Sequence, residues 1–214
     1  MIEHLEPQGS PEWLESRRGV ITASQFRVCR DKTKKGEYSS AAMLYAMDTA
    51  RERVGGIAPG VFVNAAMRTG TEQEPFARAA YEARYGVLVD EAGFITTDDR
   101  RFGVSVDGKV GDMGAVEIKT LVSSEAIFTA MVAGDVSKYR DQCLGAMWIL
   151  RLRWVDVCLW APDLADNPLR VIRINRDEDE IQKLEDDLMA FERLVSGLES
   201  QLRAVVYGDS LHAA

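Results

Sequence analysis

The sequence predicts a mixed α/β fold in which a central mixed sheet is flanked by helices. Apolar side chains recur at helical spacing near the N-terminus, strand-like alternation dominates the middle of the chain, and the C-terminal region is one long amphipathic stretch. The chain has 214 residues, 46% hydrophobic and 28% charged, as expected of one compact domain. We expect a single domain over 1–214, with a helical part at about 1–85, a sheet core at about 86–175 and an acidic helix at about 177–206.

The N-terminal part is expected to be helical. Ser10, followed by a proline, is typical of an N-cap with proline in the first helical turn. Another short helix is expected to start at Thr22-Ala23-Ser24, a further one over 39–54, before a pair of glycines, and a longer one over 62–85. Gly70 and Pro75 interrupt the longer helix, and because proline lacks a backbone N–H we predict a break there.

The middle of the chain combines strands with two helices. Strands are expected where β-branched and aromatic residues alternate with polar ones, at 87–97 (two around a turn), 102–106, 116–119, 154–160 and 169–174. Helices are expected over 123–133 and 136–150. The final helix carries an apolar stripe on one face, made of Leu184, Leu188, Phe191, Leu194, Val195 and Leu198.

Charge is unevenly distributed along the chain. The net charge is −8, from 26 basic and 34 acidic side chains, which does not by itself indicate a nucleic-acid partner. Residues 175–214 hold four basic and ten acidic side chains, whereas 27–37 is a loop with five Lys or Arg. Solvated surfaces are the ordinary explanation of both segments.

The cysteines and the hydropathy of the sequence indicate the cellular compartment of the protein. Cys29, Cys143 and Cys158 are odd in number and widely spaced, which suits neither a disulfide framework nor a zinc site, so we expect small, apolar or partly buried residues. No apolar run approaches the ~20 residues that span a bilayer, and the first residues do not resemble a signal peptide. We expect a cytoplasmic protein without membrane contact.

One stretch groups charged side chains that can carry chemistry. Asp107 ends one expected strand, and Glu117 and Lys119 lie two apart on the next, so that both project to one face while Ile118 projects to the other. Two carboxylates and an ammonium on one sheet edge are costly unless something binds there, and their hard oxygen ligands suit Mg²⁺ or Mn²⁺. A solvated hairpin is the ordinary alternative for this spacing taken alone.

Five ordered blocks carry a resemblance to a known family. They are W-x3-R-x-G-x-I-T-A-S from Trp13, Gly70-x3-Glu74, Ser105-x-Asp107-Gly108, Glu117-Ile118-Lys119 and Tyr139-x2-Gln142-x4-Met147-Trp148. With these blocks, over about Glu12 to Ile174, the chain resembles the phage lambda-type exonucleases, also called alkaline or viral-recombinase exonucleases, of the Asp…Glu-x-Lys nuclease superfamily. The resemblance implies that the predicted sheet is a restriction-endonuclease-like nuclease core.

The resemblance also implies a set of site residues. The ligands of one or two Mg²⁺ ions, with Mn²⁺ as a substitute, would be Glu74, Asp107, Glu117 and the carbonyl of Ile118. Glu72 stands near, but the spacing from Gly70 selects Glu74. Lys119 would position the attacking water and Gln142 would hydrogen-bond it, which completes the catalytic set of Asp107, Glu117, Lys119 and Gln142. The 5′-phosphate of DNA would be bound by Arg17, Ser24 and Ser105.

DNA contacts are expected in the helical part of the chain. The candidates are Trp13, stacking at the DNA end, and the basic loop residues Arg30, Lys32, Lys34 and Lys35. The resemblance further implies that Met67, just before the Gly70 block, is an apolar wedge in the duplex. Ordinary structural roles stay open for several positions. Ser24 is also suited to cap a helix, Gln142 to a helix surface and Arg17 to an ion pair with Glu12 or Glu15, while Trp13 and Met67 also suit a core.

The function implied by the resemblance is a Mg²⁺-dependent 5′-to-3′ exonuclease on double-stranded DNA. Such an enzyme releases 5′-mononucleotides and leaves a 3′ single-stranded overhang. The resemblance further implies a homotrimeric ring around DNA ends, a single-strand annealing protein as partner, and a phage or prophage origin in a bacterial host. Two alternatives are an endonuclease of the same superfamily and a non-catalytic DNA-end-binding recombination protein.

Overall fold

The computed structural model describes residues 1–57 and 65–208, without the side chains of 65–67. Backbone contacts divide the chain into two compact units that interleave along the sequence. Unit 1 comprises Met1–Gly60, Phe94–Val104 and Glu178–Ala214, and unit 2 comprises Val61–Gly93 and Ser105–Asp177. The organisation as one domain with three consecutive parts stays a prediction.

Unit 1 contains a small four-stranded sheet. Its strands are β1 (Ile2–His4), β2 (Ile21–Thr22), β3 (Phe94–Thr96) and β4 (Phe102–Val104), in the order β1-β3-β4-β2. β2 runs parallel to β4, with Ile21 opposite Phe102, and the other pairs are antiparallel. Helix α1 (Pro11–Arg17) contacts β3, and the hydroxyl of Ser10 caps it by accepting the Trp13 N–H at 3.1 Å, as the sequence predicts.

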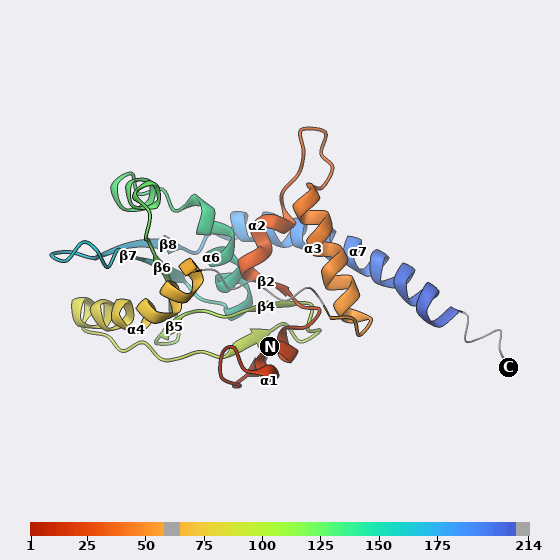
Figure 1. Cartoon of the computed structure of the whole chain (residues 1–214), viewed down its shortest axis with the longest axis horizontal. Helices are drawn as coiled ribbons and strands as arrows, with labels where there is room; N and C mark the ends of the chain where they lie inside the picture. Colours follow the sequence, from red (N-terminus) through yellow and green to blue (C-terminus); the bar gives the residue numbers. More distant parts are fainter. Residues whose placement is uncertain (58–64, 209–214) are drawn as a thin grey trace. The chain divides into compact units, whose positions relative to one another are not determined.

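The helices of unit 1 pack on the long C-terminal helix. A single 3₁₀ turn (Ala23–Gln25) precedes α2 (Phe26–Cys29), and both α2 and α3 (Ser40–Arg53) contact α7 (Glu178–Gly208; Figure 1). The predicted stripe on α7 is confirmed, because Leu184, Leu188, Phe191 and Val195 are buried. The Phe191 ring lies 6.0 Å from the ring of Tyr45 on α3.

Unit 2 contains the second four-stranded sheet. Its strands are β5 (Gly108–Val110), β6 (Gly114–Thr120), β7 (Trp154–Trp160) and β8 (Leu169–Asn175), paired in that order. β6 and β7 are parallel, with Glu117 opposite Val157, and both outer pairs are antiparallel. The central strands β6 and β7 are mostly apolar and buried, as expected of strands covered on both faces, although Glu117 and Asp156 are buried among them.

Helices cover this sheet in unit 2. Helix α4 (Ala65–Tyr85) contributes Ala77 and Tyr81 to an apolar cluster with Val116 and Ile118 of β6. Helix α6 (Ser137–Leu150) contacts β7 and hydrogen-bonds to Glu117 of β6. Between β6 and α6 lie the short helix α5 (Ser124–Ala126) and a π-helical turn, η2 (Ile127–Val132).

The mixed α/β class with helices flanking a sheet is confirmed, with one sheet in each unit. The predicted break in the helix over 62–85 is wrong, because α4 continues through Pro75. Anchors lie on both sides of the proline: Gln73 accepts the indole N–H of Trp160 at 3.0 Å, and Arg78 donates to the Asp107 carbonyl at 2.9 Å. These tertiary contacts offset the one backbone hydrogen bond that proline removes.

The prediction for the cysteines is confirmed, since Cys29, Cys143 and Cys158 are all buried free thiols. Burial raises the pKa of Cys143 and of Cys158, which keeps both thiols protonated and unreactive. None of the helices in the described part of the chain combines the length and the apolar character that crossing a membrane requires.

Candidate active site

The charged cluster in unit 2 is built on strand β6. The Ile118 side chain belongs to the apolar cluster with α4, so the neighbouring Glu117 and Lys119 side chains project to the opposite face. There Lys119 Nζ lies 2.7 Å from Glu117 Oε1. Glu117 is only 3% exposed, which means that its charge depends on these partners for compensation.

Helix α6 completes this cluster with an amide. Gln142 Nε2 donates to Glu117 Oε1 at 2.7 Å, and Gln142 Oε1 accepts from Lys119 Nζ at 3.4 Å. The Lys119 ammonium also lies 5.1 Å from the centre of the Tyr139 ring, one helical turn before Gln142. The structure therefore brings Glu117, Lys119 and Gln142 into mutual contact, and Gln142 is not a solvated surface residue.

Asp107 lies in the segment before β5 and is hydrogen-bonded to strand β6. Its Oδ2 accepts the backbone N–H of Ile118 at 2.6 Å. Burial and the nearby Glu117 carboxylate raise the pKa of Asp107 well above its usual range, against the opposing effects of Lys119 and the Ile118 N–H. A concentration of negative charge in a buried place is an arrangement that a cation relieves.

Lys119 balances part of this negative charge. Burial alone would lower the pKa of Lys119, but the carboxylates of Glu117 and Asp107 outweigh that effect and raise the pKa above its usual range. The ammonium is thus a fixed positive charge and a triple hydrogen-bond donor beside the two carboxylates.

Glu74 lies on α4 and is held by an arginine that sequence reasoning missed. Arg78 Nη2 donates to Glu74 at 2.7 Å and also to the backbone carbonyl of Asp107 at 2.9 Å. Arg78 thereby connects α4 to the segment that carries Asp107. The i,i+4 spacing of Glu74 and Arg78 was the available sequence signal. Glu72 is exposed.

The carboxylate oxygens of the site suit a hard cation, although they do not converge on a single point. Within residues 1–57 and 65–208, no three His, Cys, Asp or Glu side chains come close enough to hold a metal ion together. Glu74 is paired with Arg78, and Glu117 with Lys119 and Gln142. The oxygens of Glu74, Asp107 and Glu117 are nevertheless of the type that Mg²⁺ and Mn²⁺ prefer.

The residues predicted to bind a 5′-phosphate fall in both units. In unit 1, the Arg17 guanidinium lies over the Trp13 ring at 4.4 Å and over the Phe94 ring at 4.8 Å. Burial lowers the pKa of Arg17 from its usual value, and the guanidinium nevertheless remains charged at neutral pH. Ser24 is exposed, with its Oγ 3.3 Å from the Thr22 hydroxyl. Ser105, in unit 2, is partly buried.

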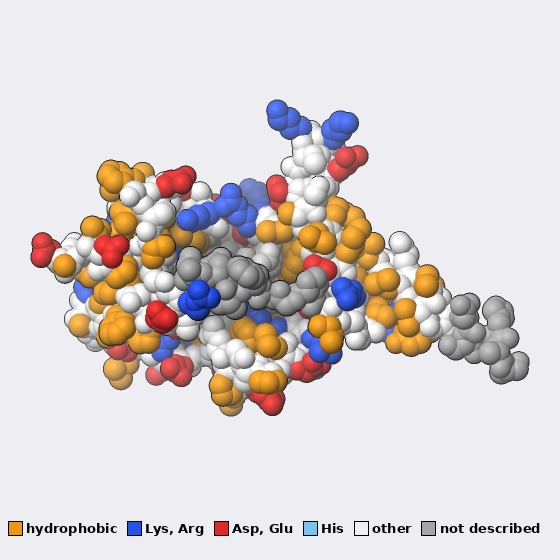
Figure 2. Space-filling model, in the orientation of Figure 1, with side chains coloured by type: hydrophobic (Ala, Val, Ile, Leu, Met, Phe, Trp, Pro, Cys, Tyr) orange, Lys and Arg blue, Asp and Glu red, His pale blue; other side chains and the backbone are white. Residues whose placement is uncertain are grey.

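The remaining predicted DNA contacts differ in their surroundings. Lys32, Lys34 and Lys35 are exposed on the loop between α2 and α3, which Figure 2 shows tipped with basic side chains. Arg30, at the base of the loop, instead pairs with Asp187 of α7 at 2.9 Å. Trp13 is partly buried against Arg17. The Met67 side chain lies outside the described residues.

Comparison with solved structures defines the class of protein. The chain is similar to the alkaline exonuclease from Laribacter hongkongensis, with a TM-score of 0.81 and 30% identity over 95% of this chain and 100% of that one. The same exonuclease in complex with dAMP gives a TM-score of 0.83 and 29% identity over 93% and 99% of the two chains. Fold and homology thus define an enzyme of the exodeoxyribonuclease class.

The family is defined by sequence. The chain belongs to the YqaJ-like viral recombinase domain family, whose model matches residues 12–151. A phage-related exonuclease from Haemophilus somnus shares the fold, with a TM-score of 0.66 and 17% identity over 86% of this chain and 96% of that one. No curated protein sequence matches the chain. The nucleases of this family are metal-dependent.

Proposed function

We propose that this enzyme is a Mg²⁺-dependent 5′-to-3′ exonuclease that degrades one strand of double-stranded DNA from its end. The observation that supports this best is the contact cluster of Glu117, Lys119 and Gln142, with Asp107 bonded to the same strand, in a member of a recombinase family. The products would be 5′-mononucleotides and a 3′ single-stranded overhang. The relative from Laribacter was solved with dAMP, which is a 5′-mononucleotide.

Four groups of this chain would hold the metal. They are the carboxylates of Glu74, Asp107 and Glu117 and the carbonyl of Ile118, for one or two Mg²⁺ ions, with Mn²⁺ as a substitute. When bound, the metal supplies Lewis acidity toward the phosphate and the water nucleophile. Arg78 would have to release Glu74 for this carboxylate to serve as a ligand.

The chain's own residues would position the reactants. Lys119 would donate hydrogen bonds to the attacking water and to the phosphate oxygens, where negative charge builds up. Gln142, already bonded to Glu117 and Lys119, would fix the orientation of that water through its amide. Arg17, with Ser24 and Ser105, would bind the terminal 5′-phosphate and so set the cut one nucleotide from the end.

The formation of an overhang calls for particular partners. DNA ends are the substrate, Trp13, Met67 and the basic loop from Arg30 to Lys35 are the DNA contacts, and a homotrimeric ring would keep the enzyme on its strand. A single-strand annealing protein would receive the overhang during phage-type recombination. The site of action would be the cytoplasm of a bacterial host that carries the phage or prophage.

One experiment tests polarity and mode of cleavage together. Linear duplex DNA with a 5′-phosphate on one strand is incubated with Mg²⁺ or with EDTA, beside a covalently closed circle of the same sequence. We expect Mg²⁺-dependent loss of the phosphorylated strand alone, with the circle intact. Cutting of the circle would identify an endonuclease, and binding without cleavage would identify a non-catalytic DNA-end-binding protein.

A further inference from the structure

A polar cavity in unit 1 is separate from the residues assigned to catalysis. It has a volume of about 320 Å³ and lies between the loop after α1, the β3–β4 turn, the end of α3 and the middle of α7. Five arginines line it: Arg18, Arg53, Arg100, Arg101 and Arg203. Only three carboxylates, those of Asp99, Glu192 and Glu199, face them. The lining therefore carries a net positive charge, although α7 belongs to the most acidic part of the chain.

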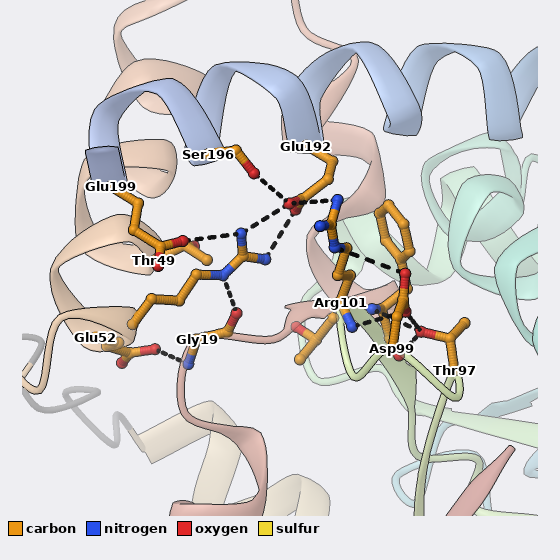
Figure 3. Close-up of polar contacts among 12 residues, drawn as sticks. Gly19, Thr49, Glu52, Thr97, Asp99, Arg101, Glu192, Ser196 and Glu199 are labelled. Carbon is orange, nitrogen blue, oxygen red and sulfur yellow. Dashed lines mark hydrogen bonds and ion pairs between the residues drawn. The ribbon is translucent and has the colours of Figure 1, made fainter. Parts of the chain in front are cut away.

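One carboxylate of the cavity is already saturated by hydrogen bonds. Arg53 Nη1 and Nη2 donate to the two oxygens of Glu192, each at 2.8 Å, and the Ser196 hydroxyl donates to Glu192 at 2.8 Å (Figure 3). Arg53 Nε in turn donates to the Gly19 carbonyl at 2.7 Å. Glu192 is 1% exposed and the Arg53 side chain 13%, so this neutral pair forms the floor of the cavity, with Glu199 3.8 Å from Arg53 Nη1.

Arg203 is also committed, because it donates to Glu199 at 2.9 Å and to the Arg53 carbonyl at 3.0 Å. The other three arginines, Arg18, Arg100 and Arg101, are much less so. Arg101 Nη1 lies 3.4 Å from Glu192 and its Nε 3.6 Å from Asp99 (Figure 3). Both ion pairs are longer than a usual hydrogen bond. Among the residues that the structure describes, Arg18 pairs only with Glu15, in an exposed contact at 2.8 Å that contributes little. Arg100 makes no side-chain hydrogen bond or ion pair with any residue in the described part of the chain.

Arg100 also has an unusual backbone conformation. Its φ of 56° lies in the left-handed region, which costs a non-glycine residue about 1–2 kcal/mol. Asparagine or glycine would fit this position with less strain. The Arg100 side chain is thus held, against the backbone preference of a non-glycine residue, at a cavity that already has more arginines than carboxylates.

We propose that this cavity binds the phosphate group of a nucleic acid or nucleotide, at a site distinct from the predicted 5′-phosphate residues. The planar guanidinium forks of Arg18, Arg100 and Arg101 suit bidentate contacts to phosphate oxygens, and an anion relieves the repulsion among them. The volume is at the lower end for ligand sites, enough for a phosphate with its sugar. Two sources share this chemistry: a DNA strand passing over unit 1, and free phosphate or mononucleotide.

A matched pair of variants tests the site. Arg100→Asn removes the guanidinium and suits the left-handed backbone. Arg151→Asn, at a φ of 57° after α6 in unit 2, is the control that makes the same change elsewhere. Both are introduced into the full chain carrying Lys119→Ala and assayed in EDTA, so binding is measured without hydrolysis and the result does not depend on the proposed catalytic residues. Thermal melting verifies that each variant folds.

The ligands are a fluorescent single strand and a blunt duplex, titrated over a range of salt, with inorganic phosphate and dAMP titrated by calorimetry. We expect Arg100→Asn to weaken DNA binding about three- to tenfold and to lower the salt slope by about 0.7–0.9, as for one lost phosphate contact, while Arg151→Asn changes neither. Arg18→Gln should act in the same direction.

The pattern of losses identifies the source of the phosphate. Weaker DNA binding with little binding of the small ions assigns the site to a DNA strand. Unchanged DNA binding, together with loss of phosphate or dAMP binding, assigns it to a free anion. If Arg100→Asn, Arg18→Gln and Arg151→Asn all match the parent for every ligand, the cavity does not bind phosphate and the proposal is wrong.

Discussion

Removal of the Glu192 carboxylate should destabilise the protein more than removal of any exposed carboxylate. Glu192 accepts three hydrogen bonds at 2.8 Å, two of them from Arg53, whose side chain is only 13% exposed. In Glu192→Ala the Arg53 cation loses its bidentate counter-ion and retains the more distant Glu199 carboxylate at 3.8 Å, which costs about 3–5 kcal/mol, and Ser196 loses its acceptor, for about 1 kcal/mol more. The loss of about 4–6 kcal/mol approaches the whole stability of a marginal domain.

Urea unfolding followed by circular dichroism measures this loss. With an m-value near 3 kcal/mol/M for a chain of this size, the midpoint should fall by about 1–2 M. Glu15→Gln is the control, because its pair with Arg18 has the same 2.8 Å separation but is exposed, so it should cost less than about 1 kcal/mol.

A double variant separates the destabilisation caused by an unpaired buried charge from the net contribution of the ion pair to stability. Arg53→Met with Glu192→Leu replaces the pair by apolar groups and should recover most of the loss. About 1 kcal/mol should remain, since Arg53 also donates to the Gly19 carbonyl at 2.7 Å. A Glu192→Ala midpoint no lower than that of Glu15→Gln would refute the reasoning.

Three further predictions concern the active site, the DNA end and alkaline stability. Lys119→Ala and Asp107→Ala should each slow strand degradation at least about 100-fold with an unchanged circular dichroism spectrum, and full activity in both would exclude the assigned site. Arg17→Ala should abolish the rate preference for 5′-phosphorylated over 5′-hydroxyl ends, whereas equal loss on both ends would contradict its role. Burial raises the pKa of Tyr45 to about 12, so the native state resists ionisation of this phenol. The contribution of Tyr45 to stability is therefore complete below about pH 10, and the free energy of unfolding should fall by about 2–3 kcal/mol between pH 10 and 12. Tyr45→Phe should lose about 1 kcal/mol at pH 7, because the Thr22 N–H loses its acceptor, yet show a flatter urea-midpoint curve above pH 10; parallel curves would rule this out.

Local patterns in the sequence were sufficient for most of the fold. The strand over 154–160 and the stripe through Leu184 and Phe191 follow from periodicity, which depends only on neighbouring residues. The strands β1 and β2 were missed because two or three residues are too short to show alternation. Pro75 was misjudged because contacts to Trp160 and Asp107, distant in sequence, hold α4 together across it.

Some contacts of the candidate site could likewise be predicted from the sequence and others could not. Glu117 and Lys119 share a face because strand geometry alone requires it, and the structure places them in contact at 2.7 Å. The partner of Glu74 was not predicted, although Arg78 stands four residues away on the same helix. An i,i+4 pair is frequent on solvated helices, and only the tertiary structure shows that Arg78 also reaches the Asp107 carbonyl.

The burial of Glu192 could have been predicted from the sequence, although its partner could not. It lies four residues after Leu188 and three before Val195, so helical periodicity places its carboxylate on the buried stripe of α7. A buried carboxylate requires a cation, and that requirement could be read from the sequence. The identity of the cation could not, because Arg53 is 139 positions away and nothing in the local pattern distinguishes it from the other arginines. The cavity above these two residues could therefore not be predicted from the sequence, since its surplus of positive charge exists only once four separate segments of unit 1 have come together.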